Sequence, residues 1–142
     1  MPRRVATGID PKRLAMIVAV LARHAGVALG QADVFVNVAG GVRIDEPGAD
    51  LAVALAIASA ARRAPVKGST AAFGEIGLTG RLRPATQADR RLEECAKLGL
   101  RHVVAPAGTP ARGTLDVTQA ETLRQAIRAG LDGDRSEGDE RA

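Results

Sequence analysis

Valines at positions 34, 36 and 38 alternate with Phe35 and Asn37, and an almost wholly apolar run follows at residues 51–61. The alternation, with its β-branched valines, predicts a strand. The apolar run contains one polar side chain, Ser59, so we expect a helix that sheet and other helices cover on most sides. Pro47 suits a helix start, and Asp50 places a carboxylate near the positive end of the helix dipole. The rest of the chain is organised around this strand, loop and helix.

Local patterns predict further elements before and after that unit. Asp10 precedes a proline and apolar residues at helical spacing, which predicts a capped helix over residues 11–25. Residues 71–78 have the composition of a second strand. The dipeptide Thr79-Gly80 predicts a tight turn into a short strand at residues 81–83, which makes the pair a β-hairpin.

The last part of the domain contains two patterns typical of helix starts. Thr86 with Asp89 three residues later resembles a capping box, and Thr118 with Glu121 repeats the pattern before the last helix. Between the two predicted helices, residues 102–105 form a short apolar run that ends at a proline, as a buried strand does.

Strands and helices alternate after the central unit, which favours an α/β or α+β domain of two layers, with a mixed sheet packed against three or four helices. A length of 142 residues fits one domain, to which we assign residues 1–131. Residues 132–142 are charged and poor in apolar groups, so we expect a disordered acidic tail. The absence of a long apolar run and the single cysteine, Cys95, predict a soluble, cytoplasmic chain in which Cys95 is a small core residue.

Net charge points to an anionic partner. The formal charge is +4, but residues 132–142 contain five acids and two arginines, so residues 1–131 carry +7. Nearly all the basic residues are arginine, which suits phosphate. Two phenylalanines and no tryptophan or tyrosine leave little base-stacking surface. We therefore expect contacts with the phosphate backbone of DNA.

Several catalytic motifs are missing. The sequence contains no G-x-x-x-x-G-K-[ST] phosphate loop, no G-x-S-x-G nucleophile turn, and no histidine or cysteine spacing typical of a metal site. We therefore predict no cofactor and no metal for this chain.

Three segments in fixed order, VNVAGGVRIDEPGADLAVALAIASA, FGEIGLTGRLRP and RLEECAKLGLRHVVAP, resemble the C-terminal Lon-protease-like domain of the RadA (Sms) family of bacterial DNA repair proteins. The similarity runs from about Arg4 to Gly130. It implies the fold of the Lon proteolytic domain. It also implies a longer parent protein, a DNA-dependent ATPase or helicase, with a zinc finger and a RecA-like ATPase domain that uses ATP and Mg²⁺.

The resemblance also predicts the catalytic state. Lon-type proteases use a serine and a lysine, and the matching positions here are Gly48 and Asp89, so the dyad is absent. We expect Gly48 to serve the backbone geometry of the loop and Asp89 to cap the next helix. Ser59 and Lys67 are a weak substitute pair, since one lies within a helix and the other in a loop.

The acidic residues of the central loop leave two interpretations open. Asp45, Glu46 and Asp50 are candidates for a divalent cation site, or they cap the helix and pair with arginines such as Arg43. The second interpretation is favoured.

Basic side chains near the motifs are the candidates for contact with DNA: Arg43, Arg62, Arg63, Arg81, Arg83, Arg90, Lys12 and Arg13. Arg43 is the first choice because it lies in the motif itself. Lys12 and Arg13 lie off the apolar stripe of the first helix and should be solvated.

The family resemblance predicts the remaining partners, which are other copies of the chain in a hexameric ring and the parent's RecA-like ATPase domain. The favoured hypothesis is a non-catalytic scaffold with a phosphate-binding surface. Alternatives are an accessory domain of a magnesium-chelatase-like ATPase such as ComM, and an active Ser-Lys hydrolase with unrecognised residues.

Overall fold

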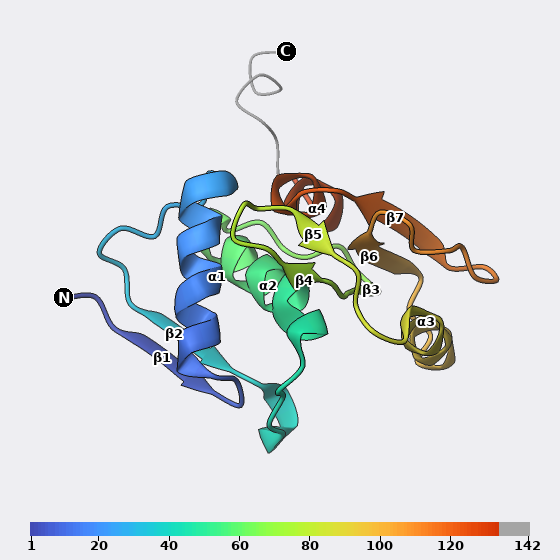
Figure 1. The fold of residues 1–142 in the computed structure, drawn as a ribbon, viewed down its shortest axis with the longest axis horizontal. Coiled ribbons are helices and arrows are strands. Elements are labelled where there is room, and N and C mark those ends of the chain that lie inside the picture. Colours follow the sequence, from blue (N-terminus) through green and yellow to red (C-terminus); the bar gives the residue numbers. More distant parts are fainter. Residues whose placement is uncertain (134–142) are drawn as a thin grey trace, which may run out of the picture.

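A computed structural model describes residues 1–133 as four helices and seven strands (Figure 1). The helices are α1 (Pro11–His24), α2 (Asp50–Arg62), α3 (Ala88–Lys97) and α4 (Leu123–Gly130). The strands are β1 (Arg4–Thr7), β2 (Val34–Asn37), β3 (Thr70–Ala72), β4 (Glu75–Ile76), β5 (Leu82–Arg83), β6 (His102–Pro106) and β7 (Asp116–Ala120). The predicted α/β class is confirmed, with four helices where three or four were predicted.

Strand pairing is divided among three small sheets. Strands β1 and β2 pair in parallel, β3, β6 and β7 form a parallel sheet in that order, and β4 and β5 form an antiparallel hairpin. The predicted hairpin is therefore confirmed. Strands β1 and β7 were not predicted from the sequence, although β7 supplies the partner for the whole length of β6.

Helix α1 begins as its sequence predicts. The side chain of Asp10 accepts a hydrogen bond from the backbone N–H of Lys12 at 3.0 Å, and Pro11 occupies the first turn. The helix ends at His24, one residue before the predicted end. It packs against β1 and α2 (Figure 1).

The predicted strand over residues 71–78 is wrong in one respect, because Gly74 breaks it into β3 and β4. Gly74 has φ +151°, a conformation that favours glycine. Its N–H donates to the carbonyl of Gly48 at 2.8 Å, and its own carbonyl accepts from Leu51 at 3.1 Å. The backbone at Gly74 therefore bonds to the loop before α2 and to the first turn of α2 instead of to a neighbouring strand.

Both predicted capping boxes are wrong. Helix α3 begins after Gln87, which has φ 56° and provides no side-chain cap, so neither Thr86 nor Asp89 caps it. At α4 the capping box is formed by Thr122 and Gln125, four residues after the predicted pair. Thr118 lies within β7, where pairing with β6 overrides its local preference for a helix cap.

The apolar side chains form two clusters, one on each face of the β3–β6–β7 sheet. One cluster joins α1, α2 and α4 and includes Val104 of β6. The other joins α3 and includes Val103, the next residue of β6, together with Cys95. Cys95 is thus a core residue, as predicted, and burial raises the pKa of its thiol.

Helix α2 is less covered than its sequence predicts. Leu51, Leu55 and Ala58 are buried on its inner face, whereas Ala52 and Ala56 are exposed on the other. The alanines of the exposed face are small enough to cost little in water, so an apolar sequence did not require full burial here.

The described chain continues two residues beyond the predicted end of the domain. Leu131 pairs with Val66, and the N–H of Asp132 donates to the carbonyl of Pro65 at 2.7 Å. The rest of the predicted acidic tail, residues 134–142, lies outside the described residues. In residues 1–133 no helix is both long enough and apolar enough to span a bilayer.

Candidate functional site

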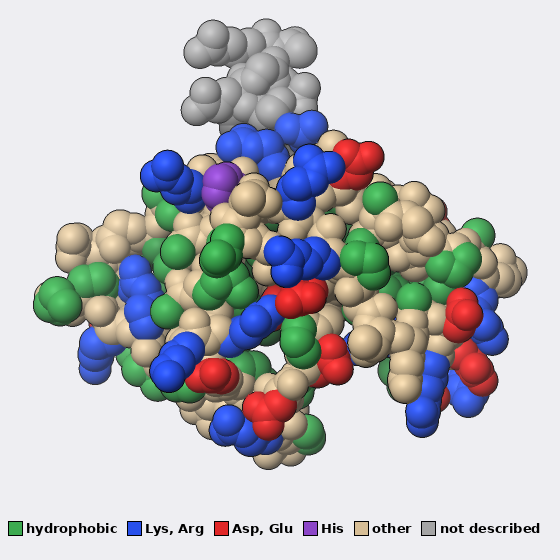
Figure 2. Space-filling model, viewed as in Figure 1, with side chains coloured by type: hydrophobic (Ala, Val, Ile, Leu, Met, Phe, Trp, Pro, Cys, Tyr) green, Lys and Arg blue, Asp and Glu red, His purple; other side chains and the backbone are tan. Residues whose placement is uncertain are grey.

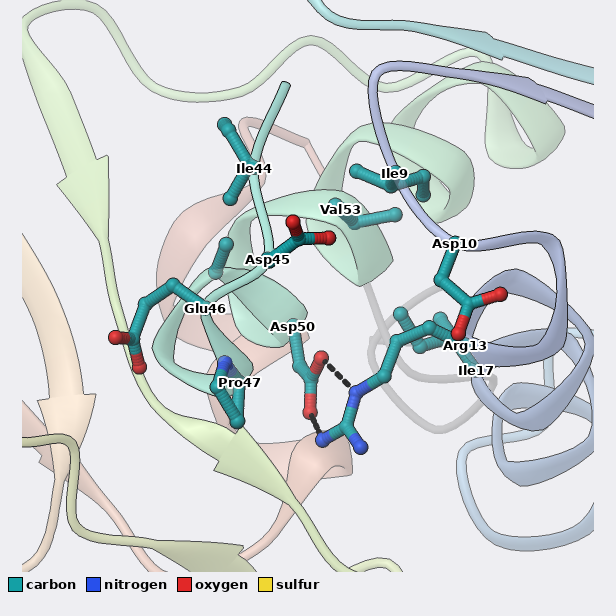
Figure 3. A pocket seen from close by; sticks show the side chains of 11 residues that line it. Ile9, Asp10, Arg13, Ile17, Ile44, Asp45, Glu46, Pro47, Asp50 and Val53 are labelled. Carbon is teal, nitrogen blue, oxygen red and sulfur yellow. Dashed lines mark hydrogen bonds and ion pairs between the residues drawn. The ribbon is translucent and has the colours of Figure 1, made fainter.

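The central loop forms one wall of a small cavity beside the start of α2 (Figure 3). Residues Pro47–Ala49 make a single turn of 3₁₀ helix, and the carboxylate of Glu46 accepts a hydrogen bond from the N–H of Gly48 at 2.9 Å. The cavity has a volume of about 200 Å³ and is closed on the other side by the first turns of α1.

A buried ion pair joins the two helices at this cavity. Asp50 is 2% exposed, and both of its oxygens face the guanidinium of Arg13, with Nε to Oδ1 at 2.7 Å (Figure 3). The same carboxylate accepts a hydrogen bond from the N–H of Ile76 at 3.1 Å. The hydrogen bond to Asp50 is the main reason why the pKa of Arg13 is raised, against a smaller opposing effect of burial.

Arg13 is therefore only partly solvated, with 34% of its side chain exposed, and the prediction did not include its ion pair. The apolar stripe of α1 does not include Arg13, but the neighbouring helix places a carboxylate within reach of it. A second carboxylate, Glu75 of β4, lies 3.6 Å from the same guanidinium. Arg13 thus links α1, α2 and the β4–β5 hairpin.

The three acidic side chains of the loop pair with three different arginines, as the favoured interpretation predicts. Asp45 pairs with Arg43 at 3.3 Å, and Glu46 pairs with Arg91 at 3.4 Å. Asp50 pairs with Arg13. In Figure 3 the carboxylate of Glu46 points away from that of Asp50. Residues 1–133 contain no group of three histidine, cysteine or acidic side chains that could hold a metal ion.

At Gly48, the predicted nucleophile position, space rather than backbone geometry requires glycine. Its φ is not positive, so the predicted backbone role is wrong. A Cβ at this position would lie 2.9 Å from Nη2 of Arg91 and 3.1 Å from Cβ of Ala85. Any side chain here, including that of serine, would have to displace Arg91.

Arg91 is the residue that sequence reasoning missed at this site. Its Nε donates to the carbonyl of Thr86 at 2.8 Å, and its guanidinium lies 5.9 Å from the centre of the Phe73 ring. With the Glu46 pair, these contacts hold the cation against Gly48. The only sequence signal was its position one turn into the helix that follows the hairpin, next to Arg90, which we chose instead.

The weak substitute pair has no support in the geometry. The hydroxyl of Ser59 donates to the carbonyl of Ala64 at 2.6 Å, within the end of its own helix. Lys67 lies in the loop that follows, and its backbone N–H bonds to the carbonyl of Gly130.

Basic side chains gather at the opposite end of the molecule from the loop. We define the basic pole as Arg23, His24, Arg62, Arg81, Arg124 and Arg128. Four elements meet there: the last turns of α1 and α2, the β4–β5 turn, and α4. Figure 2 shows Lys and Arg side chains over the ends of α1 and α4 at the top of the view.

Specific contacts hold these four elements together. The guanidinium of Arg62 donates to the carbonyl of Ala25 at 3.1 Å, and that of Arg124 lies 3.4 Å from a Cβ placed on Gly26. The β4–β5 turn bonds to α4 through the N–H of Leu123, which donates to the carbonyl of Gly80 at 2.8 Å. The pole is therefore a fixed surface and not a set of independent loops.

Three arginines of the pole face water without a carboxylate partner in residues 1–133. Arg81 pairs with Glu121 at 3.5 Å, and both side chains are exposed. Arg23, Arg124 and Arg128 are exposed and form no ion pair with any residue of the described part of the chain. Such unneutralised charge raises the local potential for anions.

The structure does not bring the predicted arginines to one place. Arg62 and Arg81 belong to the pole, and Arg63 follows directly on Arg62. Arg43 lies near the loop at the other end of α1, where Lys12 and Arg13 also lie, and Arg90 is on α3 (Figure 1). Arg124 and Arg128 were missed. Their spacing of four residues on an amphipathic helix was the signal that could have found them, because it places both on one face.

Comparison with known proteins identifies the family. The model of a family described as subunit ChlI of Mg-chelatase matches residues 11–109. The chain belongs to this family. Within it, the similarity to the DNA repair protein RadA is extensive and confirms the resemblance found in the sequence.

Three RadA relatives illustrate the similarity. RadA of Escherichia coli K12 is 47% identical over 106 residues, 75% of this chain and 23% of the relative. RadA of Haemophilus influenzae is 41% identical over 128 residues, 90% and 28% of the two chains. RadA of Bacillus subtilis is 39% identical over 137 residues, 93% and 30%. The chain thus spans less than a third of the length of these RadA proteins.

Proposed function

We propose that this chain is a non-catalytic Lon-like domain of a RadA-type DNA repair protein and that its basic pole binds the phosphate backbone of DNA. The observation that carries the proposal is the pole itself, in which exposed arginines from four elements are held together and three of them, Arg23, Arg124 and Arg128, have no acidic partner in residues 1–133. The relatives named as DNA repair proteins support it.

Proteolysis is absent from the proposal because no serine or lysine is available at the predicted positions. The space at Gly48 is filled by Arg91, whose guanidinium is neither a nucleophile nor a base at neutral pH. Asp89 is a carboxylate and cannot replace a lysine base. The loop therefore serves as a packed structural element.

In the full-length protein the domain would act as a scaffold. Copies of it would assemble into a hexameric ring and order the RecA-like ATPase domains of the parent, which would use ATP and Mg²⁺ and carry a zinc finger. These partners follow from the family resemblance and not from the chain's own residues.

Contacts at the pole would be independent of base sequence. Arginines of the pole reach phosphate oxygens from exposed helix positions, and backbone phosphates carry no sequence code. Binding would weaken steeply with salt because each neutralised phosphate releases counterions. The pole offers no phenylalanine, tyrosine or tryptophan for base stacking, so duplex and single strand should bind by the same charge interaction.

The test is fluorescence anisotropy of labelled duplex and single-stranded DNA at low and high salt. The double variant Arg124→Ala/Arg128→Ala removes two pole cations, and Arg101→Ala/Arg112→Ala removes two exposed arginines elsewhere. We expect the pole variant to weaken binding and to reduce the slope of log affinity against log salt by about 2, at ~0.9 per phosphate contact. The Arg101→Ala/Arg112→Ala control should change the affinity and the salt slope little. No binding by the wild-type chain at low salt would leave the scaffold role alone.

A second assay compares this proposal with the earlier first choice. If Arg43→Ala weakens DNA binding more than the pole variant does, the DNA surface lies beside the loop. Arg43 pairs with Asp45 at 3.3 Å, so part of its charge is already neutralised. We therefore expect the pole variant to weaken DNA binding more than Arg43→Ala does.

The family description supports one alternative, an accessory domain of a magnesium-chelatase-like ATPase. The sequence that precedes this domain in the longer protein separates the two: a zinc finger and a RecA-type phosphate loop support the RadA proposal. An active hydrolase would be revealed by labelling of a serine, such as Ser59, with an acylating probe.

A further inference from the structure

Strand β2 has one unpaired edge in residues 1–133. It pairs only with β1, and the N–H groups of Val34 and Val38 donate toward β1 at 2.8 and 3.0 Å. Hydrogen-bonding groups alternate sides along a strand, so the N–H and C=O groups of Phe35 and Asn37 face the other way. None of these four groups has a hydrogen-bond partner in residues 1–133. The edge can therefore accept another strand.

An apolar cleft runs along this edge. It has a volume of about 440 Å³ and lies between β2 and α2, with Leu29 at its side. Ala56 and Ala60, two exposed residues of α2, line it, and these small side chains leave room beside the edge. Phe35 is 61% exposed, and Val5, its register partner on β1, is 43% exposed. A strand added here would remove apolar surface from water.

The edge of β2 lacks the features that protect free edges in other proteins. Residues 34–42 contain no charged side chain and no proline, which are the residues that natural edges use against pairing. The free edge of β7 differs, because Asp116 begins that strand and Glu121 follows it. Beyond β3, the backbone at Gly74 is already bonded to the loop before α2 and to α2. Among these three strands of the described chain, only β2 has an unprotected edge.

Charge favours a second copy of this chain as the partner. An uncharged edge offers no attraction to DNA or to a charged peptide. The β2 strand of another copy is uncharged over the same residues and has the same four free backbone groups. The edge is therefore complementary to itself.

Antiparallel pairing of the two edges also suits the distribution of charge. Strand β2 runs parallel to β1, which leads into the start of α1, and Val38 lies beside Gly8 at that end (Figure 1). Strand β2 therefore begins toward the basic pole and ends toward the loop. A two-fold arrangement places the pole of each copy at the loop end of the other and keeps the two poles apart.

We propose that two copies of this chain associate through the edges of β2 and form one four-stranded sheet in the order β1, β2, β2, β1. The outward groups set the register. Phe35 of one copy lies opposite Asn37 of the other, with four hydrogen bonds in all, and Val36 lies opposite Val36 of the second copy on the two-fold axis. The contact is isologous, so it is separate from the ring of the proposed function and does not depend on DNA binding.

Sedimentation equilibrium of the full chain tests the association. Asn37→Pro removes an outward N–H without removing a bond to β1, and the matched control Asn37→Ala keeps that N–H. Because two of the four hydrogen bonds are lost, we expect Asn37→Pro to raise the dimer dissociation constant about thirtyfold, with Asn37→Ala within about threefold of wild type. Circular dichroism checks folding. Phe35→Lys, at an exposed position, is a second variant that should also prevent association.

Disulfide cross-linking tests the register. Position 36 should lie about 4.5 Å, Cα to Cα, from its counterpart across the axis, which is within the range of a disulfide. We expect oxidation to join two copies of the Val36→Cys variant, whereas Val5→Cys, exposed on the neighbouring strand, should not form a cross-link. The native Cys95 is buried and contributes little background.

Three results would overturn the proposal. They are a wild-type mass of one chain at every concentration up to about 1 mM, equal association of wild type and Asn37→Pro, and equal cross-linking of the two cysteine variants. A wild-type chain that stays monomeric but binds an added uncharged strand peptide of unrelated sequence would assign the edge to another protein and would also contradict the dimer.

Discussion

The loop before α2 and the basic pole both contain arginines, but the two regions use them in opposite ways. At the loop, Arg13 and Arg91 face carboxylates, an aromatic ring and backbone carbonyls, and they hold packed elements together. At the pole, Arg124 and Arg128 extend into water with no carboxylate beside them in residues 1–133. Only the second kind of arginine is available to a phosphate.

The difference shows that net charge does not identify a binding surface. Residues 1–131 carry +7, but the cations near the family motif, where the resemblance drew attention, are largely neutralised. Arg23, Arg124 and Arg128 of the pole have no carboxylate partner in residues 1–133. The comparison also explains how the loop before α2 stays well packed, since the ion pairs of Arg13 and Arg91 hold it.

The loop should lose most stability when its buried ion pair is broken. Asp50→Ala leaves Arg13 without its main partner and the N–H of Ile76 unpaired, so we expect a loss of about 3 kcal/mol in the free energy of unfolding, measured with urea. Asp45→Ala, which breaks the exposed pair with Arg43, should cost less than about 1 kcal/mol.

The raised pKa of Arg13 also predicts how the stability from the Arg13–Asp50 pair depends on pH. The pKa of Arg13 is raised, so the stability that its charge contributes is complete below its unfolded pKa and is lost only in strong alkali. The difference in unfolding free energy between wild type and Asp50→Ala that comes from Arg13 should therefore be constant from about pH 6 to about pH 9. Equal stability of the Asp50→Ala and Asp45→Ala variants would show that the buried pair is unimportant.

Placing a serine at Gly48, the position that the family resemblance aligns with the Lon nucleophile, should destabilise the loop without creating a catalytic site. Gly48→Ser forces Arg91 to move, and we expect a loss of roughly 1–2 kcal/mol by urea unfolding, as for overpacking. Gly68→Ser is the matched control, since a Cβ there meets nothing within 4 Å. Labelling of the new serine by an acylating probe would contradict our reading of the loop.

The start of α4, which positions the arginines of the pole, should depend on its capping box. Thr122→Ala removes the side chain that accepts from the N–H of Gln125, and we expect a loss of about 1 kcal/mol. Thr118→Ala, at the position that the sequence pattern suggested, should change stability by less than about 0.5 kcal/mol. A larger loss of stability for Thr118→Ala than for Thr122→Ala would support the cap predicted from the sequence.

Exposed ion pairs of the pole should matter least for stability. Arg81→Ala removes the pair with Glu121, in which both side chains are about two-thirds exposed, and we expect a change below about 0.5 kcal/mol. The same variant should weaken DNA binding measurably at low salt. A large loss of stability without an effect on binding would place Arg81 with the arginines of the loop.

Local sequence signals predicted the elements whose ends carry their own chemistry. Asp10 and Pro11 gave the start of α1 to the residue, and Thr79-Gly80 gave the hairpin. Elements that depend on distant partners were not predicted. Strand β7 contains a Thr and a Gln and has no alternation, and it forms because β6 lies beside it. The break at Gly74 likewise depends on hydrogen bonds to the loop before α2.

The features of the candidate site also fall into those that local sequence predicted and those that depend on distant partners. The expectation that Gly48 and Asp89 stand at the dyad positions came from the family resemblance and stays a prediction. That Arg91 fills the space, and that Arg13 is bound to a buried carboxylate, required the packing of α3 and α1 against the loop. The grouping of the pole required four chain segments to meet, and no spacing within one segment contains that information.

The central claim is that DNA contacts the basic pole and not the loop, and an NMR titration of the ¹⁵N-labelled chain with a short duplex tests it most directly. We predict shifts of amide signals at residues 23–26, 80–82 and 124–128 that saturate together and disappear at high salt, with residues 45–50 unchanged. Shifts concentrated at residues 43–50, with the pole unchanged, would contradict the account.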